Sequence, residues 1–542
     1  MKKLLLGFIL FNIFNILNGQ GSISGNFRLN ADFYDRDSAI GTVGKNYDAY
    51  KTSANSWFQL FYTNPEMQFD AGIRFDVHLN SILQNPIVPR TFNGIGYWYL
   101  RKKIDKLEVT GGYFYEQYGS GIALRAFEER NLGIDNAIFG AKATYDLTDN
   151  IKLKGLAGVQ KYELGTNQQF IKAINVEVNK EINENLSFNA GASVVNRTLD
   201  ATSRGAVDAI IRQYTNPDDK FNTSYNTVIY QLYNTLTYKN LTWYFEGAYK
   251  SPEAVYNGFN RKYEERAGTS FLTSLTYTKP KFGVTAQARR TDHFQFMANS
   301  HEASQGDFNK INNTRIGYIA PINRQNSLRL PARFQIAPQD IGELGTSLDF
   351  TYSPFPKVAI NLSLCMIDTI NITDPYYREA YGDIEFKKLL GGKLKALFGG
   401  QYVYYNQILY QQDGKKDVVA YTFFSEASYK ISKQKSIRAE LQYQHAEKEL
   451  GQSIFALVEF NIAPTWSFSI SDLYNFKTNP NYFIVENRVP HHFYSFFAAY
   501  TKGATRLTMG YVKQLQGIVC TGGVCRMEPA FSGIRAQLTT SF

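Results

Sequence analysis

The sequence has few of the residues that mark the common alternatives to a large β protein. Its 542 residues include only 3 Cys and 4 Trp. Three cysteines are too few for a disulfide-stabilised scaffold. Beyond the N-terminus, no apolar run approaches the roughly 18 residues that a membrane-spanning helix needs. A disulfide-rich module and a helical membrane protein are therefore both excluded.

Phe and Tyr are the residues in excess, at 40 and 38 respectively. A chain this rich in aromatics is not intrinsically disordered, because disordered chains lack them. The mean hydropathy is nevertheless polar, at -0.32. A polar average with many Tyr and Phe is typical of a membrane β-barrel, in which each strand turns one face to lipid and the other to water. Composition alone does not separate such a barrel from a secreted all-β protein.

The N-terminal residues predict the cellular compartment. Two lysines precede a mostly apolar stretch, Leu4 to Leu17, which is followed by Asn18-Gly19-Gln20. A basic start, an apolar centre and a small residue at the end indicate a secretory signal peptide. A short membrane anchor is the alternative, although the stretch is short for a membrane span. We therefore expect residues 1–19 to be a signal peptide and residues 20–542 to form a single barrel domain.

Strict alternation of polar and apolar residues is the main structural signal. It runs from Ser436 to His445 and recurs over 186–194 and 241–250. Successive side chains of a strand point to opposite faces, so each segment has one apolar and one polar face. A tilted membrane strand needs about 9–11 residues, whereas ordinary strands have about 5–6. The length of the pattern therefore favours a barrel. The expected lipid-facing residues of the first segment are Ile437, Ala439, Leu441 and Tyr443, and its expected lumen-facing residues are Arg438, Glu440 and Gln442.

Short and long connections alternate between the predicted strands. Eleven short turns carry residues with a turn mechanism, mostly Pro, Gly, Asn or Asp. They lie at 64–65, 104–105, 148–149, 183–184, 239–240, 279–280, 353–356, 391–392, 432–434, 463–464 and 502–503. The longer polar stretches are 36–51, 117–135, 198–222, 251–266, 291–341, 477–490 and 515–529.

These turns give the strand number. Eleven turns join 22 strands, and a leading strand (Gly21 to Asp35) and a closing strand (Phe531 to Phe542) bring the total to about 24. We accept a range of about 20 to 26, because strand boundaries are harder to predict than strands. The fold class is therefore all-β, a transmembrane antiparallel barrel in the outer membrane of a Gram-negative bacterium. Its short turns and both termini are expected on the periplasmic side and its long loops outside the cell.

The last strand carries a signal of its own. Alternation continues from Ile534 to the C-terminal residue, Phe542. An aromatic residue at the end of an amphipathic strand resembles the signal that the barrel insertion machinery of the outer membrane reads. We expect Phe542 to act as this signal.

Aromatic residues cluster near several predicted strand ends. The clusters are 97–99, 113–115, 402–405 and 493–497. Amphipathic rings favour the boundary between lipid and water, so these clusters predict aromatic girdles. Ordinary core packing is the alternative. Phe114, Tyr244 and Phe424 point inward in the predicted register, and we expect them to fill the lumen.

The segment from Glu116 to Gly140 is the most unusual in the chain. It combines a Gly119-Ser120-Gly121 turn with five charged residues among small and apolar ones. A loop this rich in Leu, Ile and Phe needs burial, so we expect it to fold into the barrel. A phosphate-binding turn is excluded, because no Lys-Ser or Lys-Thr follows the glycines. The residues of this inward-loop motif are Gly119, Gly121, Arg125, Glu128, Glu129, Arg130 and Asp135.

Two stretches of sequence resemble a known family. One is Glu116-Gln117-Tyr118-Gly119-Ser120-Gly121 with the later Glu-Glu-Arg-Asn-Leu-Gly-Ile-Asp-Asn of 128–136, and the other is Gly-Gly-Val-Cys-Arg-Met-Glu-Pro-Ala-Phe of 522–531. Both are similar to a Bacteroidota family of outer-membrane β-barrels of unknown function. The resemblance covers nearly the whole mature chain. It implies the barrel fold and no particular activity.

Cysteine and histidine offer little chemistry. Cys520 and Cys525 bracket a short loop, and a disulfide between them would suit the oxidising envelope. Cys365 is expected on the inner face as a lone thiol. We expect no metal site and no cofactor, although His293 and His301 share the longest loop with acidic residues. No Ser/His/Asp arrangement with a nucleophile elbow is present, so we expect no enzyme activity; a site on the barrel rim is the alternative.

The expected width of the barrel raises the question of what closes it. Barrels of 16–18 strands already hold an aqueous channel, so about 24 strands would leave a wider one. The best candidate for a plug is the loop 291–341, with the motif 116–135 beside it. An extracellular arm is the alternative for the long loop. The expected lumen-lining residues are Glu108, Glu116, Glu246, Lys250, Glu426, Arg438, Glu440 and Arg535.

These features predict a loop-occluded channel for a polar solute. The alternative is a closed structural or secretion-accessory barrel that docks other envelope proteins. The expected partners are outer-membrane lipid, lipopolysaccharide, the insertion machinery and an envelope protein, but no nucleic acid.

Overall fold

The computed structural model describes most of the chain. The described residues are 21–42, 48–83, 89–257, 260–301, 312–340, 342–370, 374–411, 417–446, 451–477, 491–521 and 524–542. Of residues 411, 477, 518–521 and 524–527 only the backbone is described. The predicted signal peptide, residues 1–19, lies outside these ranges.

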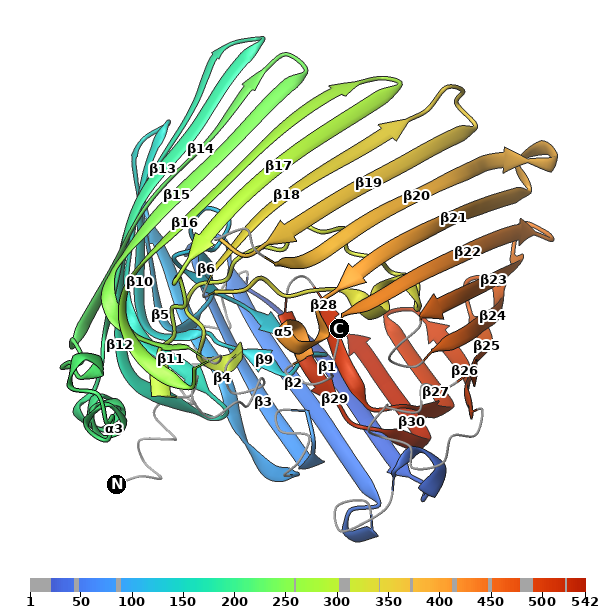
Figure 1. The fold of residues 1–542 in the computed structure, drawn as a ribbon, viewed down its shortest axis with the longest axis horizontal. Coiled ribbons are helices and arrows are strands. Elements are labelled where there is room, and N and C mark those ends of the chain that lie inside the picture. The colour runs from blue at the N-terminus through green and yellow to red at the C-terminus, as the bar shows by residue number, and fades with distance from the viewer. Residues whose placement is uncertain are drawn as a thin grey trace.

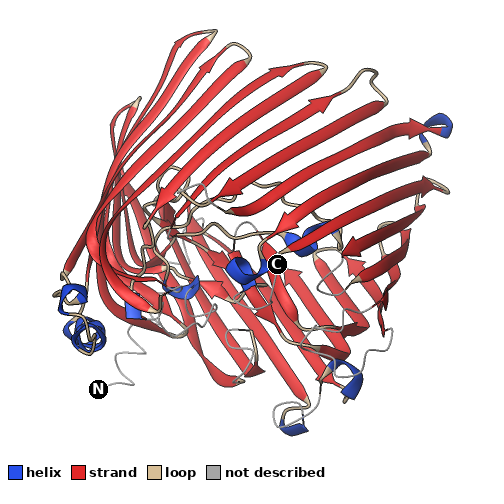
Figure 2. Ribbon diagram, viewed as in Figure 1, coloured by secondary structure: helices blue, strands red, loops and turns tan. Residues whose placement is uncertain are grey.

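The described residues form a closed antiparallel barrel of 24 strands, which confirms the predicted fold class and strand number (Figures 1 and 2). Each strand pairs with its neighbours in chain order, and the last strand pairs with the first. The strands are β1 (Ser22–Tyr34), β2 (Thr52–Asn64), β3 (Phe69–Ser81), β4 (Arg90–Ile104), β5 (Leu107–Phe114), β10 (Ile138–Thr148), β11 (Ile151–Tyr162), β12 (Gly165–Asn183), β13 (Leu186–Thr198), β14 (Asn226–Tyr238), β15 (Leu241–Asn257), β16 (Lys262–Lys279), β17 (Phe282–Asp292), β18 (Gly342–Tyr352), β19 (Val358–Asp368), β20 (Pro375–Leu389), β21 (Leu394–Tyr405), β22 (Val418–Lys430), β23 (Lys435–Ala446), β24 (Gln452–Ile462), β25 (Trp466–Lys477), β26 (His491–Lys502), β27 (Thr505–Gln514) and β30 (Phe531–Ser541).

Strands β1 and β30 close the barrel through backbone and side-chain contacts. Gly25 and Phe542 exchange two backbone hydrogen bonds of 2.8 and 3.0 Å. The Arg535 Nε atom donates to Asp32 Oδ1 over 2.9 Å across the same pair of strands. Closure removes free strand edges, so the barrel has no unpaired ladder that must be covered.

The two ends of the barrel differ. All eleven predicted short turns join consecutive strands at one end, which we call the turn end. The opposite end, the loop end, carries most of the long connections. One predicted connection, 251–266, is wrong: β15 continues to Asn257 and β16 begins at Lys262. The strands extend because α3 (Ala201–Arg212) packs its Val207 and Ile211 side chains against them.

Small elements occupy the loops. Hairpins β6 (Glu116–Gln117) with β7 (Arg125–Ala126) and β8 (Glu128–Glu129) with β9 (Ile134–Asp135) lie between β5 and β10. Hairpin β28 (Gly517–Thr521) with β29 (Val524–Glu528) lies between β27 and β30, and α5 (Gln407–Gln411) follows β21. Among the described residues, no helix is long and apolar enough to span a membrane.

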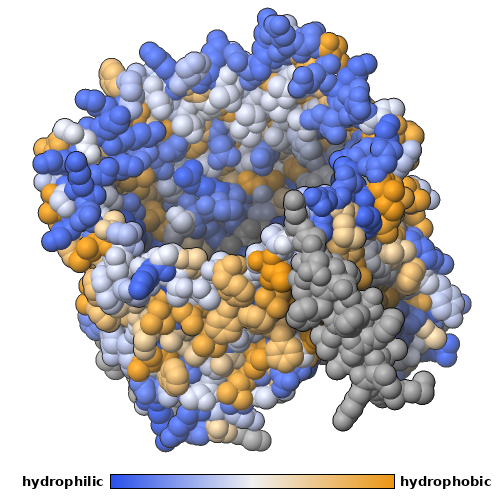
Figure 3. All heavy atoms as spheres, turned by 180° about the vertical axis from the view of Figure 1, so that it is seen from behind, coloured by the Kyte–Doolittle hydropathy of each residue, from blue (hydrophilic) through white to orange (hydrophobic). Residues whose placement is uncertain are grey.

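The wall has an apolar outer face and a polar inner face. On β23, Leu441 is 55% exposed, whereas Gln442 is fully buried. Leu232 and Ile470 are similarly exposed, at 63% and 59%. Figure 3 shows a hydrophobic band on the outer wall and, toward the turn end, a hollow surrounded by hydrophilic residues. This distribution is the one that a barrel surrounded by lipid requires.

Part of the aromatic prediction is wrong. Tyr97 and Tyr113 are 8% and 6% exposed, and both rings stack inside the barrel rather than at its lipid boundary. The cause is a bulge in β4, where the register with β3 shifts between the pairs Arg74–Tyr97 and Phe75–Ile95. The extra residue turns Tyr97 inward. Trp98 remains on the outer face, at 37% exposed.

Candidate functional site

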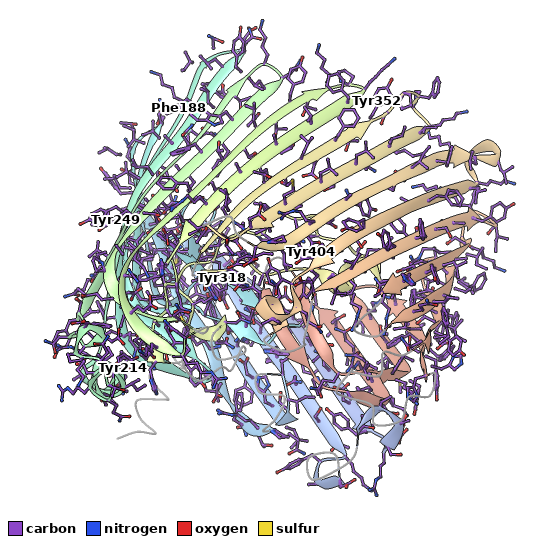
Figure 4. The ribbon with its side chains drawn as sticks, in the orientation of Figure 1. Phe188, Tyr214, Tyr249, Tyr318, Tyr352 and Tyr404 are labelled. Atoms are coloured by element: carbon purple, nitrogen blue, oxygen red, sulfur yellow. The ribbon has the colours of Figure 1, made fainter. Side chains whose placement is uncertain are left out.

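Two segments of the chain lie inside the barrel (Figures 1 and 4). The motif segment, residues 115–137, joins β5 to β10. The long segment lies between β17 and β18, and the name covers its described residues, 293–301 and 312–340. Figure 4 shows Tyr318 of the long segment in the middle of the barrel, far from Phe188 and Tyr352 near the turn end. We consider the two segments together as the candidate functional site.

A buried arginine of the wall anchors the motif segment. The Arg74 side chain on β3 is 1% exposed and donates to Asp76 two hydrogen bonds of 2.7 and 2.9 Å. Its Nη1 atom donates to Glu128 of the motif segment over 2.6 Å, and its Nη2 atom, which also donates to Asp76, donates to Asp135 over 2.6 Å. One planar guanidinium therefore binds three carboxylates, which Lys with its single ammonium does not reproduce.

Asp135 has three partners besides Arg74, one of them within the motif segment itself. Lys161 of β11 forms an ion pair with its carboxylate, and the Tyr115 hydroxyl donates to it over 3.0 Å. The backbone N–H of Asp135 donates to Asn313 of the long segment over 3.2 Å. Burial raises the pKa of Asp135, but Lys161 and Arg74 outweigh burial and hold it at about 2. The carboxylate therefore stays ionised at neutral pH.

The space beside this cluster is small. The cavity holds about 30 Å³ and is lined by Trp57, His78 and Phe92 together with the charged groups. The charged groups around it pair with one another across the segment and the wall. The cluster therefore acts as an anchor between the segment and the wall.

A second contact ties the motif segment to β1 and β2. The guanidinium groups of Arg28 and Arg130 lie 5.8 and 5.6 Å from the centre of the Trp57 ring. Arg28 also donates to Asn131 over 2.6 Å, and Arg130 donates to Gln59 over 3.1 Å. Glu129 lies beside Arg28 and accepts from the backbone of Asn131.

The glycine turn of the motif faces a carboxylate. Gly119 and Gly121 have φ values of +54° and +101°, and the backbone N–H of Ser120 donates to Glu246 of β15 over 3.1 Å. A Cβ on Gly119 would lie 2.3 Å from the same carboxylate oxygen. The Tyr244 hydroxyl donates to Glu246 over 3.0 Å. Because this turn donates to a fixed protein carboxylate, it offers no vacant donor cradle for a phosphate.

The two segments also bind each other. The backbone N–H of Arg125 donates to Ile316 over 2.8 Å, and that of Tyr318 donates to Gly121 over 2.9 Å. The Asn136 amide donates to the Tyr318 hydroxyl over 3.1 Å. The segments therefore pack as one body. Their shared apolar cluster contains Ile122, Leu124, Phe294, Phe296, Ile316 and Ile319, together with wall residues of β10 to β15.

Buried charges of the wall hold the start of the long segment. Arg197 of β13 donates to the Met297 carbonyl over 3.0 Å, and Lys250 of β15 donates to the Gln295 carbonyl over 2.6 Å. Both cations pair with Glu253, each over 2.6 Å. Isolated buried charges are costly, so this pairing is what permits Arg197 and Lys250 to lie in the wall.

The rest of the long segment crosses to the opposite wall. The Arg289 guanidinium of β17 binds the carbonyl of Ala320 and the carboxylate of Glu343. Further along, Leu330 exchanges backbone hydrogen bonds of 2.7 and 3.2 Å with the side chains of Gln442 and Gln444 on β23. Two apolar clusters accompany this crossing: Ile322, Phe334 and Ile336 against residues of β19 to β23, and Leu330 against Phe455, Leu473 and Phe493.

The predicted lumen-lining residues are dispersed. Glu246 and Lys250 contact the inner segments as described, whereas the others, apart from Glu108, form separate ion pairs. Arg438 pairs with Glu426 and Glu440 at 2.9 Å each. Glu116 lies 3.2 Å from Lys142 and 3.9 Å from Lys154. Arg535 pairs with Asp32, and Glu108 lies half-buried on β5. These residues are not brought together in one site.

Sequence reasoning missed several residues that hold the inner segments. Asp76, Lys161, Glu253 and Arg289 were not among the predicted site residues. The polar face of β3 offers a signal for the first of them, because Arg74, Asp76 and His78 alternate with apolar residues. The other three give no such local signal, because they have partners that are distant in sequence. Lys161 pairs with Asp135, and Glu253 pairs with Arg197 as well as with the nearby Lys250. Arg289 pairs with Glu343.

Among the described residues, the cysteine and histidine side chains do not gather into a reactive site. Cys365 is a free, buried thiol on β19. Cys520 and Cys525 are directly opposite in the backbone register of β28 and β29, but their side chains lie outside the described residues, so the disulfide stays a prediction. No group of three or more His, Cys, Asp or Glu residues within the described ranges could hold a metal ion.

Comparison with solved structures returns other barrels at low similarity. The siderophore receptor PirA from Pseudomonas aeruginosa is 9% identical, with a TM-score of 0.44 over 97% of this chain and 81% of that one. The copper transporter OprC is 9% identical, with a TM-score of 0.41 over the same shares. The translocation pore of the P pilus usher PapC is 7% identical, with a TM-score of 0.41 over 96% and 99%. These likenesses are too distant to indicate a function.

Comparison by sequence returns a family. No curated protein matches the chain. A family model matches residues 1–542, the whole chain. The protein therefore belongs to the family of unknown function DUF6029.

Proposed function

We propose that this protein is an outer-membrane channel for a polar solute, closed at rest by its own motif and long segments. In this proposal the turn end faces the periplasm and the loop end faces outward. The observation that carries the proposal is the position of the two segments, which bind both sides of the inner wall through named ion pairs and hydrogen bonds. A barrel of 24 strands needs such a plug, because barrels of about 16–18 strands already hold an aqueous channel.

The nature of the plug contacts supports a closure that can be released. On the motif side the contacts are ionic: Arg74, Lys161 and Arg130 face Asp76, Glu128 and Asp135. Water can replace such contacts when the segments move, since both charge signs are hydrated readily. The hydrophilic hollow at the turn end suits a polar solute (Figure 3).

A closed structural or secretion-accessory barrel is the second candidate. The apolar clusters around Leu330, Phe334 and Ile336 favour it, because they bury the long segment against the wall. Displacing that part of the segment would expose the apolar side chains to water. In this case the barrel would serve to dock other envelope proteins.

Single-channel recording in planar bilayers separates the two candidates. We expect brief openings of the wild type, more frequent openings of Arg74→Gln, and a lasting conductance after deletion of 299–326. If the protein is a closed scaffold, the wild type and Arg74→Gln should both show no conductance, and only the deletion variant should leak. Silence of Arg74→Gln with a correctly inserted barrel would therefore overturn the channel proposal.

The source organism and the partners are part of the same proposal. We infer a Gram-negative, Bacteroidota source from the two motifs. Outer-membrane lipid, lipopolysaccharide and the barrel insertion machinery are the proposed partners, with Phe542 as the insertion signal. The proposal involves no catalytic step and no cofactor.

A further inference from the structure

The turn end of the barrel carries positive charge on one side. Four neighbouring hairpins, β16–β17, β18–β19, β20–β21 and β22–β23, hold ten lysines and a single acidic residue, Glu385, over 279–281, 353–357, 385–395 and 430–435. We call these lysines the lysine arc. They are Lys279, Lys281, Lys357, Lys387, Lys388, Lys393, Lys395, Lys430, Lys433 and Lys435. All are exposed except Lys387, which is half-buried.

The opposite side of the turn end is mixed in charge. Hairpins β2–β3, β4–β5, β10–β11 and β12–β13 hold eight acidic and six basic residues over 64–70, 101–108, 146–152 and 180–186. The asymmetry is therefore a property of one set of hairpins and not of turn composition in general. Within the described residues, the lysine arc makes one ion pair, Lys387 with Glu385 at 3.9 Å.

Three large apolar side chains lie among these lysines. Phe355, Leu390 and Ile431 occupy the tips of three consecutive turns and are 66%, 68% and 49% exposed. Apolar tips also occur on the opposite side, where Ile104 and Ile182 are 61% and 53% exposed. The distinguishing feature is thus their surroundings: a cluster of apolar anchors with a charged rim is the usual composition of a protein interface.

We propose that the lysine arc docks an acidic protein in the periplasm, with Phe355, Leu390 and Ile431 as its apolar centre. Lipid headgroups surround all 24 strands, so a role in binding anionic lipid would place lysines around the whole ring. A one-sided arc fits one partner on one side. Eight strands about 4.8 Å apart give an arc of about 35 Å. A standard interface covers about 800 Å² on each partner, a patch about 30 Å across, so the arc is long enough for one.

This inference rests on the orientation given in the proposed function, but not on conduction. A barrel that never conducts could still dock its partner, and a conducting barrel could lack one. The test is therefore a binding measurement, whose failure is distinguishable from the failure of the channel proposal.

Two matched variants of the full-length chain test the surface. The arc variant changes six exposed lysines to Gln, and the control variant changes the six basic residues of the opposite side, so that both lose the same charge. The arc variant is Lys388→Gln, Lys393→Gln, Lys395→Gln, Lys430→Gln, Lys433→Gln and Lys435→Gln. The control variant is Arg101→Gln, Lys102→Gln, Lys103→Gln, Lys106→Gln, Lys152→Gln and Lys180→Gln.

The first measurement uses fluorescent poly-L-glutamate and each barrel in nanodiscs of zwitterionic phosphatidylcholine. We expect the arc variant to bind at least about tenfold more weakly than wild type, the control variant to bind within about twofold, and wild-type binding to weaken with salt. Equal binding by both variants would overturn the proposal. Heat-modifiable electrophoretic mobility would show that both barrels are folded.

The second measurement places a photo-crosslinking phenylalanine at Leu390 or Ile431 in living cells, and at Ile104 or Ile182 as controls. We expect one adduct with a protein of acidic composition at the first two positions, absent at the controls and lost in the arc variant. Adducts that are equal at all four positions, or none, would overturn docking. A third outcome is that no protein adduct forms, while phosphatidylglycerol is enriched around the wild type but not around the arc variant. This result would assign the lysines to lipid binding and would also overturn the docking proposal.

Discussion

Arg74 is the residue whose removal tests the plug most directly. Its side chain lies in the wall at 1% exposed and pairs with Asp76, Glu128 and Asp135. Arg74→Gln keeps a polar side chain but shortens it and removes the charge, so three carboxylates are left with Lys161 and Arg130 as counter-charges. Breaking a buried ion pair by removing one partner costs about 3–5 kcal/mol. The barrel should survive this loss, because its 24 paired strands do not depend on the cluster.

The free energy lost in Arg74→Gln should instead release the motif segment from the wall more often. At about 1.4 kcal/mol for each tenfold change, 3–5 kcal/mol raises the open population by about a hundred-fold to a few thousand-fold. Trypsin provides the assay, because Arg125 and Arg130 lie in the segment and cleavage there reports its release. We expect Arg74→Gln to be cut at these residues under conditions in which the wild type resists.

Arg101→Gln is the matched control. Arg101 pairs with Asp70 at 2.8 Å on the neighbouring strand, but its side chain is 42% exposed. Exposed pairs contribute at most about 1 kcal/mol, so this variant should be cut at the wild-type rate. Equal resistance of Arg74→Gln and Arg101→Gln would refute the idea that the Arg74 cluster holds the segment in place.

Three further predictions concern separate parts of the molecule. The pKa of Asp135 is depressed from about 3.9 when unfolded to about 2. The stability that its ionised carboxylate gives to the closed motif segment is therefore present above pH 4 and is lost as the pH falls toward 2. Pepsin cleavage of the motif segment should rise over this interval, and Asp135→Asn should abolish that rise. Leu441→Arg should cost about 2–4 kcal/mol in urea titrations of the barrel in vesicles, because Leu441 lies at the middle of β23 and is 55% exposed to lipid. Leu441→Met, which keeps an apolar side chain at the same position, is the control, and an unchanged titration of Leu441→Arg would contradict the assigned faces. Deleting Phe542 should lower the amount of barrel in the outer membrane well below that of a variant lacking Asn222, an exposed residue of the loop between β13 and β14. Normal amounts would refute its role as an insertion signal.

Local patterns account for what the sequence predicted well. The alternation from Ser436 to His445 depends on neighbouring residues alone, since side chains two apart share a face of a strand. Turn residues such as Asn64-Pro65 act through their own backbone preferences. Repeating these two signals along the chain was enough to predict an antiparallel barrel and about 24 strands.

Local patterns gave wrong predictions where the structure depends on a contact with residues that are distant in the sequence. The stretch 251–266 is polar and was predicted as a loop, but α3 packs against it and extends β15 and β16. Tyr97 was predicted in a girdle, but a bulge opposite Arg74 turns it inward. Neither the helix contact nor the bulge leaves a mark in the local sequence.

The sequence by itself determined the barrel, its strand faces and its turn end, because these follow from alternation and turn chemistry over a few residues. It also showed that the motif segment needs burial, since Ile122, Leu124 and Ile134 lie in a connection. Only the tertiary structure decided where that burial occurs and which charges meet. Arg74 and Asp135 are 61 residues apart, and Asn136 and Tyr318 are 182 apart. Such pairs form because closing the barrel brings distant strands around one interior, where each buried charge must find an opposite one.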